Sequence, residues 1–478
     1  MNPETLNVKC QQGKSMVNGG GRLPLPRLAT QARMALHLVS EALQSALVFR
    51  HAADRCLADI FHANRQLGAR DRRVVNSTFY STLRWWGWLR TFAPADFVKH
   101  WLHGAGKDGD ESLLGSSAWK RCLAAANLLD CGGNGPTDVA FLWLKELGVE
   151  TKDISVASFD AGVLQRASVL ASLARPQEMA AFSLDALMPK WVREHLASDG
   201  SPSWQRLVEW LQKRPPVWLR CQTEYMDEIR ESLAHDGIPT LPSSLLPDAL
   251  QINSDGNVNL RNAEAFRNGS IEIQDLASQC VGLVCAPVPG QQWWDACAGA
   301  GGKTLQLAGM MKGKGTVLAT DLRLYKLDEL KLRARRAQFS NIRCKEWKGK
   351  PMPAFRNRFD GVLVDVPCSC SGTWRRNPGA RWTTDEEDML QFPPLQLQLL
   401  CNAADAVKPG GTLVYSTCSM LEDENRRVAR QFLKSRGDFE LVPFECPLTG
   451  MENDGCNQIW PWDGDCDAMF TAKFRRAK

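Results

Sequence analysis

The stretch Gly411-Thr-Leu-Val-Tyr-Ser-Thr-Cys-Ser-Met-Leu-Glu-Asp-Glu-Asn425 decides the fold of this chain. Its apolar run, Leu413 to Tyr415, predicts a buried strand, and the Ser-Thr-Cys-Ser sequence that follows predicts a turn. The acidic residues after the turn predict the beginning of a helix. Because an open α/β sheet carries its chemistry at the carboxyl ends of its strands, Cys418 is a candidate nucleophile.

The alternation of strand and helix patterns extends on both sides of this stretch, from Gln291 onward. Strands are predicted to end at Asp295, Asp321 and Asp365, each followed by a loop and a helical pattern. Strands that alternate with helices of this length indicate right-handed βαβ units on a mostly parallel sheet. We therefore expect an α/β domain over residues 289–478, whose last strand, 468–474, pairs at an edge of the sheet.

Two further regions are expected before this domain. Residues 29–183 carry apolar side chains at three- and four-residue spacing, which indicates an all-helical domain. Residues 184–288 mix short strands with a helix, which indicates a small α+β segment. Its predicted strands are 215–221, 258–260 and 271–273, and its predicted helix is 224–236. Residues 1–28 have no apolar core, and we expect a disordered leader there.

Composition bounds the class of protein. A chain of 478 residues is too long for one core, and its 44% hydrophobic and 23% charged residues are ordinary for a globular protein. The net charge of +5 permits a nucleic-acid partner without arguing for one. No apolar run approaches membrane-spanning length and no secretory signal opens the chain. We therefore expect a cytoplasmic monomer with no membrane association.

The 16 cysteines are spread along the chain without a Cys-x-x-Cys pair. In a long chain without a signal peptide, this usage is typical of a reducing compartment, and no metal site is expected.

Three tryptophans, Trp85, Trp86 and Trp88, stand between Arg84 and Arg90. Aromatic side chains mixed with arginines can stack on nucleic-acid bases. Tryptophans at helical spacing also form cores, with the arginines as a solvated rim, and we favour this interpretation.

The second decisive segment is the glycine loop Asp295-Ala-Cys-Ala-Gly-Ala-Gly-Gly-Lys-Thr304. A phosphate-binding P-loop would need glycine at position 297, which is cysteine, and a dinucleotide-binding loop would need glycine at 304, which is threonine. A third interpretation is a nucleoside-bearing cofactor without a pyrophosphate. Asp321, at the end of the next strand, can accept hydrogen bonds from both ribose hydroxyls, and S-adenosylmethionine fits this pair.

The third segment is Asp365-Val-Pro-Cys-Ser-Cys-Ser-Gly-Thr-Trp-Arg-Arg-Asn-Pro378. Cys368 by itself could be a small buried hydrophobe. Cys368 and Cys418, however, each follow a strand of the same sheet. This arrangement favours a catalytic role for both cysteines. The arginines that follow are suited to phosphate groups and are predicted to bind RNA: Arg375, Arg376 and Arg381.

Together these segments resemble the RNA cytosine-5 methyltransferase family, in particular its Sun/RsmB type and the related Nop/NSUN group. The resemblance rests on the glycine loop, on Asp365-x-Pro-Cys-Ser369 with Arg375 to Pro378, and on Tyr415-Ser-Thr-Cys-Ser419 with Glu424-Asn425. It covers about residues 184–478 and implies a Rossmann-like S-adenosylmethionine-dependent methyltransferase domain. The helical region is similar, more loosely, to a NusB-like RNA-binding domain.

The resemblance also implies roles. Cys418 would attack cytosine C6, Cys368 would assist release of the product, and Asp365 and Lys303 would contact the target base. The cofactor would be held by Asp295, Cys297, Ala298, Gly299, Ala300, Gly301, Gly302, Lys303, Asp321, Lys326 and Asp365. The chain departs from the family in having Ala300 where proline is usual, and in lacking an aspartate after the third strand.

The implied chemistry is sound in itself. Cytosine C5 is a weak nucleophile, and thiolate addition at C6 converts the ring into an enamine that can accept a methyl group at C5. The expected substrate is ribosomal RNA. The alternatives are the same reaction on transfer RNA, or a catalytically silent RNA-binding factor in ribosome assembly.

Overall fold

The computed structural model describes residues 23–103, 116–131, 136–150, 162–196, 203–222, 225–254 and 258–478. Most of the predicted leader, residues 1–22, lies outside these ranges. The remainder was wrongly assigned to the leader, because helix α1 (Leu25–Leu43) begins there. Pro26 stands in its first turn, where a missing N–H costs nothing and the fixed φ favours the helix.

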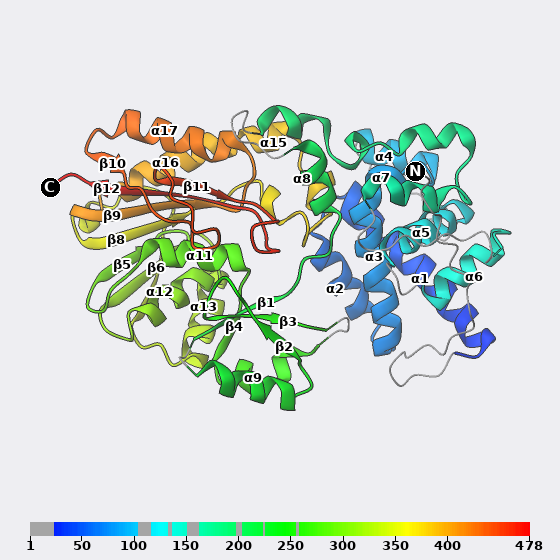
Figure 1. The fold of residues 1–478 in the computed structure, drawn as a ribbon, viewed down its shortest axis with the longest axis horizontal. Helices are drawn as coiled ribbons and strands as arrows, with labels where there is room; N and C mark the ends of the chain where they lie inside the picture. The colour runs from blue at the N-terminus through cyan, green and yellow to red at the C-terminus, as the bar shows by residue number, and fades with distance from the viewer. Residues whose placement is uncertain are drawn as a thin grey trace, which may run out of the picture.

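Helices surround α3 in the amino-terminal part of the molecule, which is drawn from blue to green in Figure 1. Their apolar faces meet in one large hydrophobic cluster, as the three- and four-residue spacing predicts. The helices are α1, α2 (Ala53–Ala63), α3 (Ala69–Leu89), α4 (Ala95–His103), α5 (Ser117–Asp130), α6 (Asp138–Glu146), α7 (Val163–Ala167) and α8 (Trp204–Leu211).

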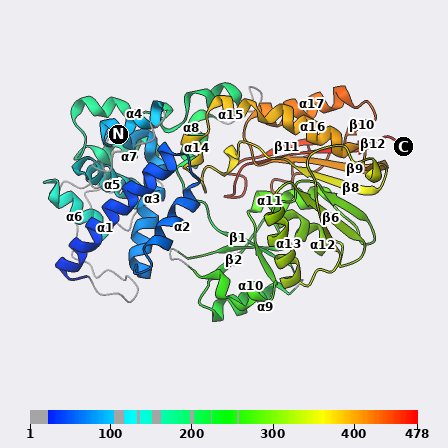
Figure 2. The same ribbon diagram turned by 180° about the vertical axis from the view of Figure 1, so that it is seen from behind.

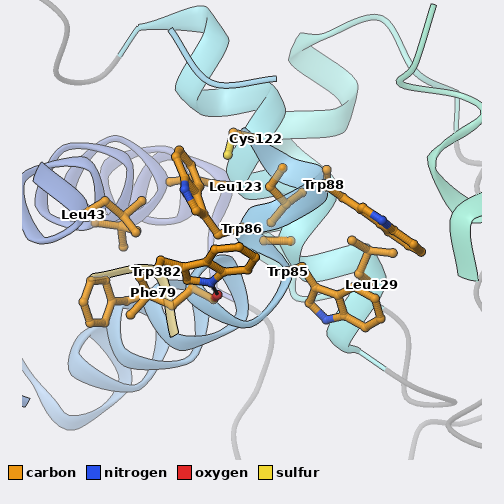
Figure 3. Packing of buried hydrophobic residues seen from close by; sticks show 14 of the residues in the cluster. Leu43, Phe79, Trp85, Trp86, Trp88, Cys122, Leu123, Leu129 and Trp382 are labelled. Carbon is orange, nitrogen blue, oxygen red and sulfur yellow. Dashed lines mark hydrogen bonds between the residues drawn. The ribbon is translucent and has the colours of Figure 1, made fainter. Parts of the chain in front are cut away.

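The three tryptophans of α3 lie in the middle of this cluster (Figure 3). Trp85, Trp86 and Trp88 are fully buried, and the ring of Trp86 stacks on that of Trp119. Trp382, which lies nearly 300 residues later in the chain, enters the same cluster and donates a hydrogen bond from Nε1 to the Leu83 carbonyl at 2.7 Å. The core interpretation of these tryptophans is therefore confirmed, and they are not a base-stacking surface. The expected solvated rim is wrong for Arg84, which is buried and donates to the Arg375 carbonyl at 2.9 Å.

A small antiparallel sheet follows in the chain, with strand order β2-β3-β1-β4. Its elements are β1 (Trp218–Cys221), α9 (Met226–His235), β2 (Thr240–Pro242), β3 (Ala249–Ile252), α10 (Glu264–Arg267) and β4 (Ile271–Ile273). The predicted strand at 258–260 is wrong, because Leu260 begins a 3-10 turn and is buried against the helical side of the sheet. The sheet itself begins only at Trp218. Residues such as Leu187 and Leu211, earlier in the segment, pack in the helical cluster instead.

The carboxyl-terminal part is built on a large twisted sheet with strand order β10-β12-β9-β8-β5-β6-β7. The five strands from β7 to β9 are parallel. The strands are β5 (Gln292–Asp295), β6 (Thr316–Asp321), β7 (Ile342–Glu346), β8 (Phe359–Asp365), β9 (Val407–Thr417), β10 (Phe439–Leu441), β11 (Cys456–Ile459) and β12 (Met469–Arg476).

Helices cover both faces of this sheet (Figures 1 and 2). Successive side chains of β9 point to opposite faces, so Leu413 and Tyr415 pack beneath α16 (Phe392–Ala404) and α17 (Arg426–Ser435), while Val414 faces the opposite cluster. That cluster includes α11 (Leu276–Cys285) and α12 (Gly302–Met310), and α13 (Leu324–Arg336) lies against β6 and β7. This three-layer arrangement is the predicted Rossmann-like architecture.

The last strand differs from the prediction. β12 does not pair at an edge but lies antiparallel between β9 and β10, with Ala472 opposite Tyr415. Its side chains are buried on both faces: Phe470, Ala472 and Phe474 on one face, and Met469 and Thr471 on the other. The antiparallel strand therefore shields β9 from solvent.

One histidine, His195, also joins the helical part to the carboxyl-terminal part. His195 contacts Asp423 through Nδ1 and Glu386 through Nε2, both at 2.8 Å. Burial alone would lower the pKa of His195, but the hydrogen bonds with Glu386 and Asp423 outweigh burial and raise the pKa above its usual 6.5.

This histidine makes a pH dependence testable. A histidine whose pKa is raised on folding stabilises the protein fully below the unfolded pKa, about 6.5, and loses that stabilisation as the pH rises through the folded value. We expect the difference in free energy of unfolding between wild type and His195→Gln to be largest near pH 6 and to shrink towards pH 9. Urea unfolding across this range measures it, and a difference that does not vary with pH would contradict the assignment.

Candidate active site

The site lies where the strand order reverses. From β5 the chain continues to β6 and β7 on one side, and then returns to add β8 and β9 on the other. The crevice at the carboxyl ends of the strands beside such a switch point is the usual ligand site of an open α/β sheet. The predicted Asp295, Asp321, Asp365 and Cys418 all stand at or just beyond these strand ends.

The glycine loop turns sharply between β5 and α12. Gly301 has φ +89° and a Cβ there would lie 2.4 Å from Leu330, so both the backbone conformation and the close approach of α13 require glycine. At Gly302, by contrast, a Cβ would have no described heavy atom within 4 Å. The loop therefore packs tightly on α13 and leaves open space above the amino terminus of α12.

Asp321 is held by the loop that it faces. Its Oδ2 accepts a hydrogen bond from the Gly299 N–H at 2.9 Å, and its Oδ1 accepts one from the Arg323 N–H at 2.8 Å. The Arg323 guanidinium also contacts Oδ1 at 3.0 Å. Burial raises the pKa of Asp321, but the hydrogen bonds from Arg323 and Gly299 outweigh burial and lower it, so the carboxylate is charged.

The loop fits a nucleoside-bearing cofactor in its polar groups as well as in its shape. Asp295 is buried, and its Oδ1 has no hydrogen-bond partner among the described residues, although its Oδ2 accepts from Thr304 at 2.6 Å. Burial raises the pKa of Asp295 to about 7. A buried oxygen without a partner is costly, and a donor group on a ligand would satisfy it.

The small sheet supports this loop. Arg333 of α13 donates to the Ala300 carbonyl at 2.7 Å, and Arg220 of β1 donates to the Gly302 carbonyl at 3.0 Å. The buried Glu272 of β4 pairs with Arg333 at 2.8 Å. Hydrogen bonds to the loop carbonyls thus stand in for the rigidity that a proline would give at position 300.

Lys303, the second residue of α12, reaches across the crevice to β8. Its Nζ lies 2.7 Å from Asp365 Oδ2, and Ser416 Oγ donates to Asp365 Oδ1 at 2.8 Å. Burial lowers the pKa of Lys303, but Asp365 outweighs burial and raises it, so the ammonium group remains charged. The carboxylate of Asp365 is thereby fixed at the end of β8 beside Cys418.

The two predicted cysteines meet. Cys368, in the loop after β8, and Cys418, directly after β9, have their sulfur atoms 3.4 Å apart. A third cysteine, Cys370, completes a cluster in which all three sulfurs lie within 4.8 Å of one another. Every cysteine in the described ranges is a free thiol.

The protons of this cluster are shared unequally. Hydrogen bonds from Cys368 and Cys418 lower the pKa of Cys370 to about 4. The pKa of Cys368 is raised by the hydrogen bonds of Cys368 with Cys370 and Cys418. For Cys418, the hydrogen bond with Cys368 lowers the pKa, but the bond with Cys370 and burial outweigh it and raise the pKa well above the usual value.

One buried carboxylate fixes both cysteine loops. Glu424 accepts hydrogen bonds from the Ser369 N–H at 2.8 Å, from the hydroxyls of Ser369 and Ser419, and from Gln396 at 3.0 Å. Ser371 Oγ and Ser419 Oγ add a direct contact between the loops at 3.0 Å. Burial raises the pKa of Glu424, although its hydrogen bonds with Ser369 and Ser419 oppose this shift.

The predicted RNA-binding arginines are mostly structural. Arg375 and Arg381 are fully buried, so their assignment as phosphate contacts is wrong. Arg375 pairs with Asp465 at 2.6 Å and donates to backbone carbonyls, and Arg381 donates to the Leu187 and Leu211 carbonyls at 3.0 and 3.1 Å. Both fasten the loop after β8 to the helical part. Arg376 is more exposed but pairs with Asp275 and Asp467.

The remaining predicted cofactor residues lie around the glycine loop. Cys297 and Ala298 belong to it, and the Ala298 N–H donates to the Thr320 carbonyl at 2.8 Å. Lys326, in the first turn of α13, pairs with Glu329 at 2.9 Å. Contact of these side chains with the cofactor remains a prediction.

Sequence reasoning gave Ser416, Arg323 and Glu424 no role in holding the site residues. Each stands beside a residue that was singled out, and Glu424 was quoted within the family motif. Its position six residues after the candidate nucleophile was the signal that could have identified it as a support.

Two family models and several known proteins match parts of this chain. Residues 282–475 match the family described as 16S rRNA methyltransferase RsmB/F, and residues 188–259 match an RsmF/B-like ferredoxin-like domain. The chain is 32% identical over 296 residues to ribosomal RNA small subunit methyltransferase B of Photorhabdus laumondii, covering 61% of this chain and 66% of that protein. It is 31% identical over 321 residues to the Pasteurella multocida protein of the same name, covering 64% and 70%.

Solved structures share the fold. The crystal structure of PH0851 has a TM-score of 0.70 and 24% identity, and covers 95% of this chain and 100% of that one. NSun6 from Pyrococcus horikoshii, crystallised with SFG, has a TM-score of 0.53 and 18% identity, and covers 61% of this chain and 98% of that one.

The fold, the site and these relatives together define a Rossmann-like S-adenosylmethionine-dependent methyltransferase. The chain belongs to the RsmB family of ribosomal RNA small subunit methyltransferases, and the matched segments span about two thirds of the length of these relatives. The expected family and cofactor are thereby confirmed. The helical region lies outside the two matched family segments, so its NusB-like character remains a prediction.

The carboxylate that joins the cysteine loops can be tested directly. Glu424→Ala should lower the free energy of unfolding by about 3 kcal/mol, because several buried donors would lose their acceptor at about 1–3 kcal/mol each. Glu422→Ala is the matched control in the same turn, since Glu422 only approaches Arg430 at 4.0 Å. Urea unfolding of the two variants measures the difference, and equal losses would show that Glu424 is not the support described above.

Proposed function

We propose that this protein transfers a methyl group to carbon 5 of a cytosine in RNA, and that ribosomal RNA is the substrate. The observation that carries the proposal is the pair of sulfurs 3.4 Å apart, presented beside the Lys303–Asp365 pair at the carboxyl ends of β8 and β9. The membership of the RsmB family supports ribosomal RNA over transfer RNA.

In the proposed mechanism, Cys418 forms a bond from its sulfur to cytosine C6, which makes C5 nucleophilic. The thiol proton of Cys418 passes to solvent as the bond forms, because the thiolate is the nucleophile. Asp365 and Lys303 face the base edge, where they stabilise the charge that develops on the ring. The bound cofactor supplies the electrophilic methyl group.

After methylation the C5 proton must be removed and the carbon–sulfur bond to Cys418 broken. Elimination returns the electron pair of that bond to the sulfur and restores the aromatic ring. Cys368 is close enough to Cys418 to assist this release. Because the C6 face of the base must be reached, the target nucleotide has to be unpaired or extruded from its helix.

The cofactor assignment rests on the glycine loop and the charged Asp321. Asp321 would accept hydrogen bonds from the ribose hydroxyls, while Arg323, which now contacts it, would turn aside. The cytoplasm, where ribosomal RNA is processed in bacteria, remains the expected location. None of the helices in the described ranges has the length and apolar character needed to cross a bilayer.

The nucleophile can be tested with labelled S-adenosylmethionine and ribosomal RNA. Cys418→Ala should abolish methyl transfer, because no sulfur is left to attack C6. Cys368→Ala should instead accumulate a covalent protein–RNA adduct, visible on a denaturing gel, because release is slowed. Full activity in Cys418→Ala would exclude the mechanism. Inactivity of the wild type on every RNA would favour the silent assembly factor, and activity confined to transfer RNA would favour the other substrate.

The cofactor site has a separate test. Asp321→Ala should raise the Kd for S-adenosylmethionine at least about tenfold, since hydrogen bonds to a charged group are worth about 1.5–3 kcal/mol. Isothermal titration calorimetry of the purified protein measures this, with Asp328→Ala on the exposed face of α13 as the control. Unchanged affinity in Asp321→Ala would remove its ribose role.

A further inference from the structure

The proposed reaction uses two sulfurs, but the site contains three. Cys368 and Cys370 lie in the loop after β8, and Cys418 lies in the loop after β9, about fifty residues later. All three sulfur atoms are within 4.8 Å of one another. Because the sulfurs come from two separate loops, no Cys-x-x-Cys spacing reveals the cluster, and the expectation of no metal site was based on that spacing alone.

Cys370 is held in an unusual conformation. Its φ is +55°, in the left-handed region that costs a residue with a Cβ about 1–2 kcal/mol. Strain of this kind is found at functional sites, where the surrounding structure maintains it. In this strained turn the sulfur of Cys370 lies 3.5 Å from the carbonyl oxygen of Cys368. It also lies beside the sulfurs of Cys368 and Cys418.

The cluster is rigid and reachable. Glu424 and the Ser371–Ser419 contact fix the two loops relative to each other, so the sulfurs do not have to be brought together from a distance. Cys368 is buried and Cys418 half-buried, but Cys370 is exposed. A small solute can therefore reach the three sulfurs from the side of the site that is open to solvent.

The electrostatics also suit a cation. A bound cation favours the thiolate over the thiol at each sulfur, because a ligating thiol must be deprotonated. Coordination would release the protons of the three thiols to solvent.

The dimensions favour a thiophilic metal ion. A Zn–S bond of about 2.3 Å places the sulfurs of a tetrahedral site about 3.8 Å apart. The separation of Cys368 and Cys418 is 3.4 Å and the other two are at most 4.8 Å, so small movements bring all three sulfurs to this spacing. Thiolate ligands select soft or borderline d¹⁰ cations, and three protein ligands leave a fourth position for water.

We propose that Cys368, Cys370 and Cys418 form a three-thiolate Zn²⁺ site that covers the nucleophile when RNA is absent. Binding breaks the S–H bonds of the three thiols, releases their protons to solvent and forms three Zn–S bonds, with no change of oxidation state. The metal and cytosine C6 then compete for the same sulfur of Cys418. This competition rests on the proposed function, whereas the binding of the metal does not.

Cadmium reports on the site without any assay of activity, because sulfur-to-cadmium charge transfer absorbs in the ultraviolet. The reduced, chelator-treated full-length protein is titrated with Cd²⁺ and then with Zn²⁺ as competitor. We expect wild type to bind one Cd²⁺ more per chain than Cys370→Gly, and to release protons as it does so. Glycine suits the left-handed φ at position 370, so this variant should fold.

Two further variants make the result decisive. Cys370→Ser keeps the side-chain size and should weaken Zn²⁺ affinity by more than the about 10–100-fold that loss of a supporting partner costs. Cys401→Ser, on α16 and outside the cluster, should bind as wild type does. Equal Cd²⁺ stoichiometry and affinity in wild type and Cys370→Gly would overturn the proposal.

An assay of methyl transfer is the second part of the test. Zn²⁺ should inhibit wild type at concentrations that leave Cys370→Gly active, and excess RNA should relieve the inhibition. Charge-transfer absorption without any methyl transfer would leave the metal site standing and reject the proposed function. Methyl transfer that Zn²⁺ inhibits equally in wild type and in Cys370→Gly would reject the metal site and leave the function standing.

Discussion

The site depends on one carboxylate that is removed from water. Glu424 has no solvent exposure, yet its two oxygens accept hydrogen bonds from both cysteine loops and from α16. Burying such a group is costly, and its pKa is raised accordingly, but the donors around it compensate for the lost hydration. Only a protein that encloses this region on all sides can maintain such an arrangement. β12, which shields β9 from solvent, and the helical part, which packs on the loop after β8, provide that enclosure.

The strand-end residues could be predicted because short-range patterns determine them. An apolar run followed by Asp295, Asp321, Asp365 or Cys418 identifies both a parallel strand and the end at which chemistry occurs. The position of β12 could not be predicted in this way, since strand order is set by contacts with β9 and β10 and not by the local sequence of residues 468–474. Arg375 and Arg381 were misassigned for the same reason. A cluster of arginines looks the same in sequence whether phosphates or buried carbonyls accept its hydrogen bonds, and here the carbonyls belong to residues more than 150 positions earlier.

The glycine loop likewise has features that the sequence predicts and features that it does not. Its glycines and its partner Asp321 are visible in the sequence, and their geometry agrees with the expectation. The support beneath it is not visible, because Arg220 and Glu272 come from two strands of the small sheet and Arg333 comes from helix α13. The small sheet is thus part of the cofactor site through the backbone carbonyls that it fixes, although it contributes none of the residues that the motifs identify.

The close approach of the helical part to the catalytic part has an evolutionary consequence. A Cβ at Gly87 would lie 1.9 Å from the Ala186 carbonyl oxygen and 2.8 Å from the ring of Trp382, and Trp382 hydrogen-bonds to the Leu83 carbonyl. Residues from α3, from the segment before α8 and from the loop after β8 therefore share one close-packed space. Relatives that change the size of one of these side chains must compensate at the others. The helical region therefore cannot be exchanged independently of the methyltransferase domain. Its sequence has to change together with that of the domain on which it packs.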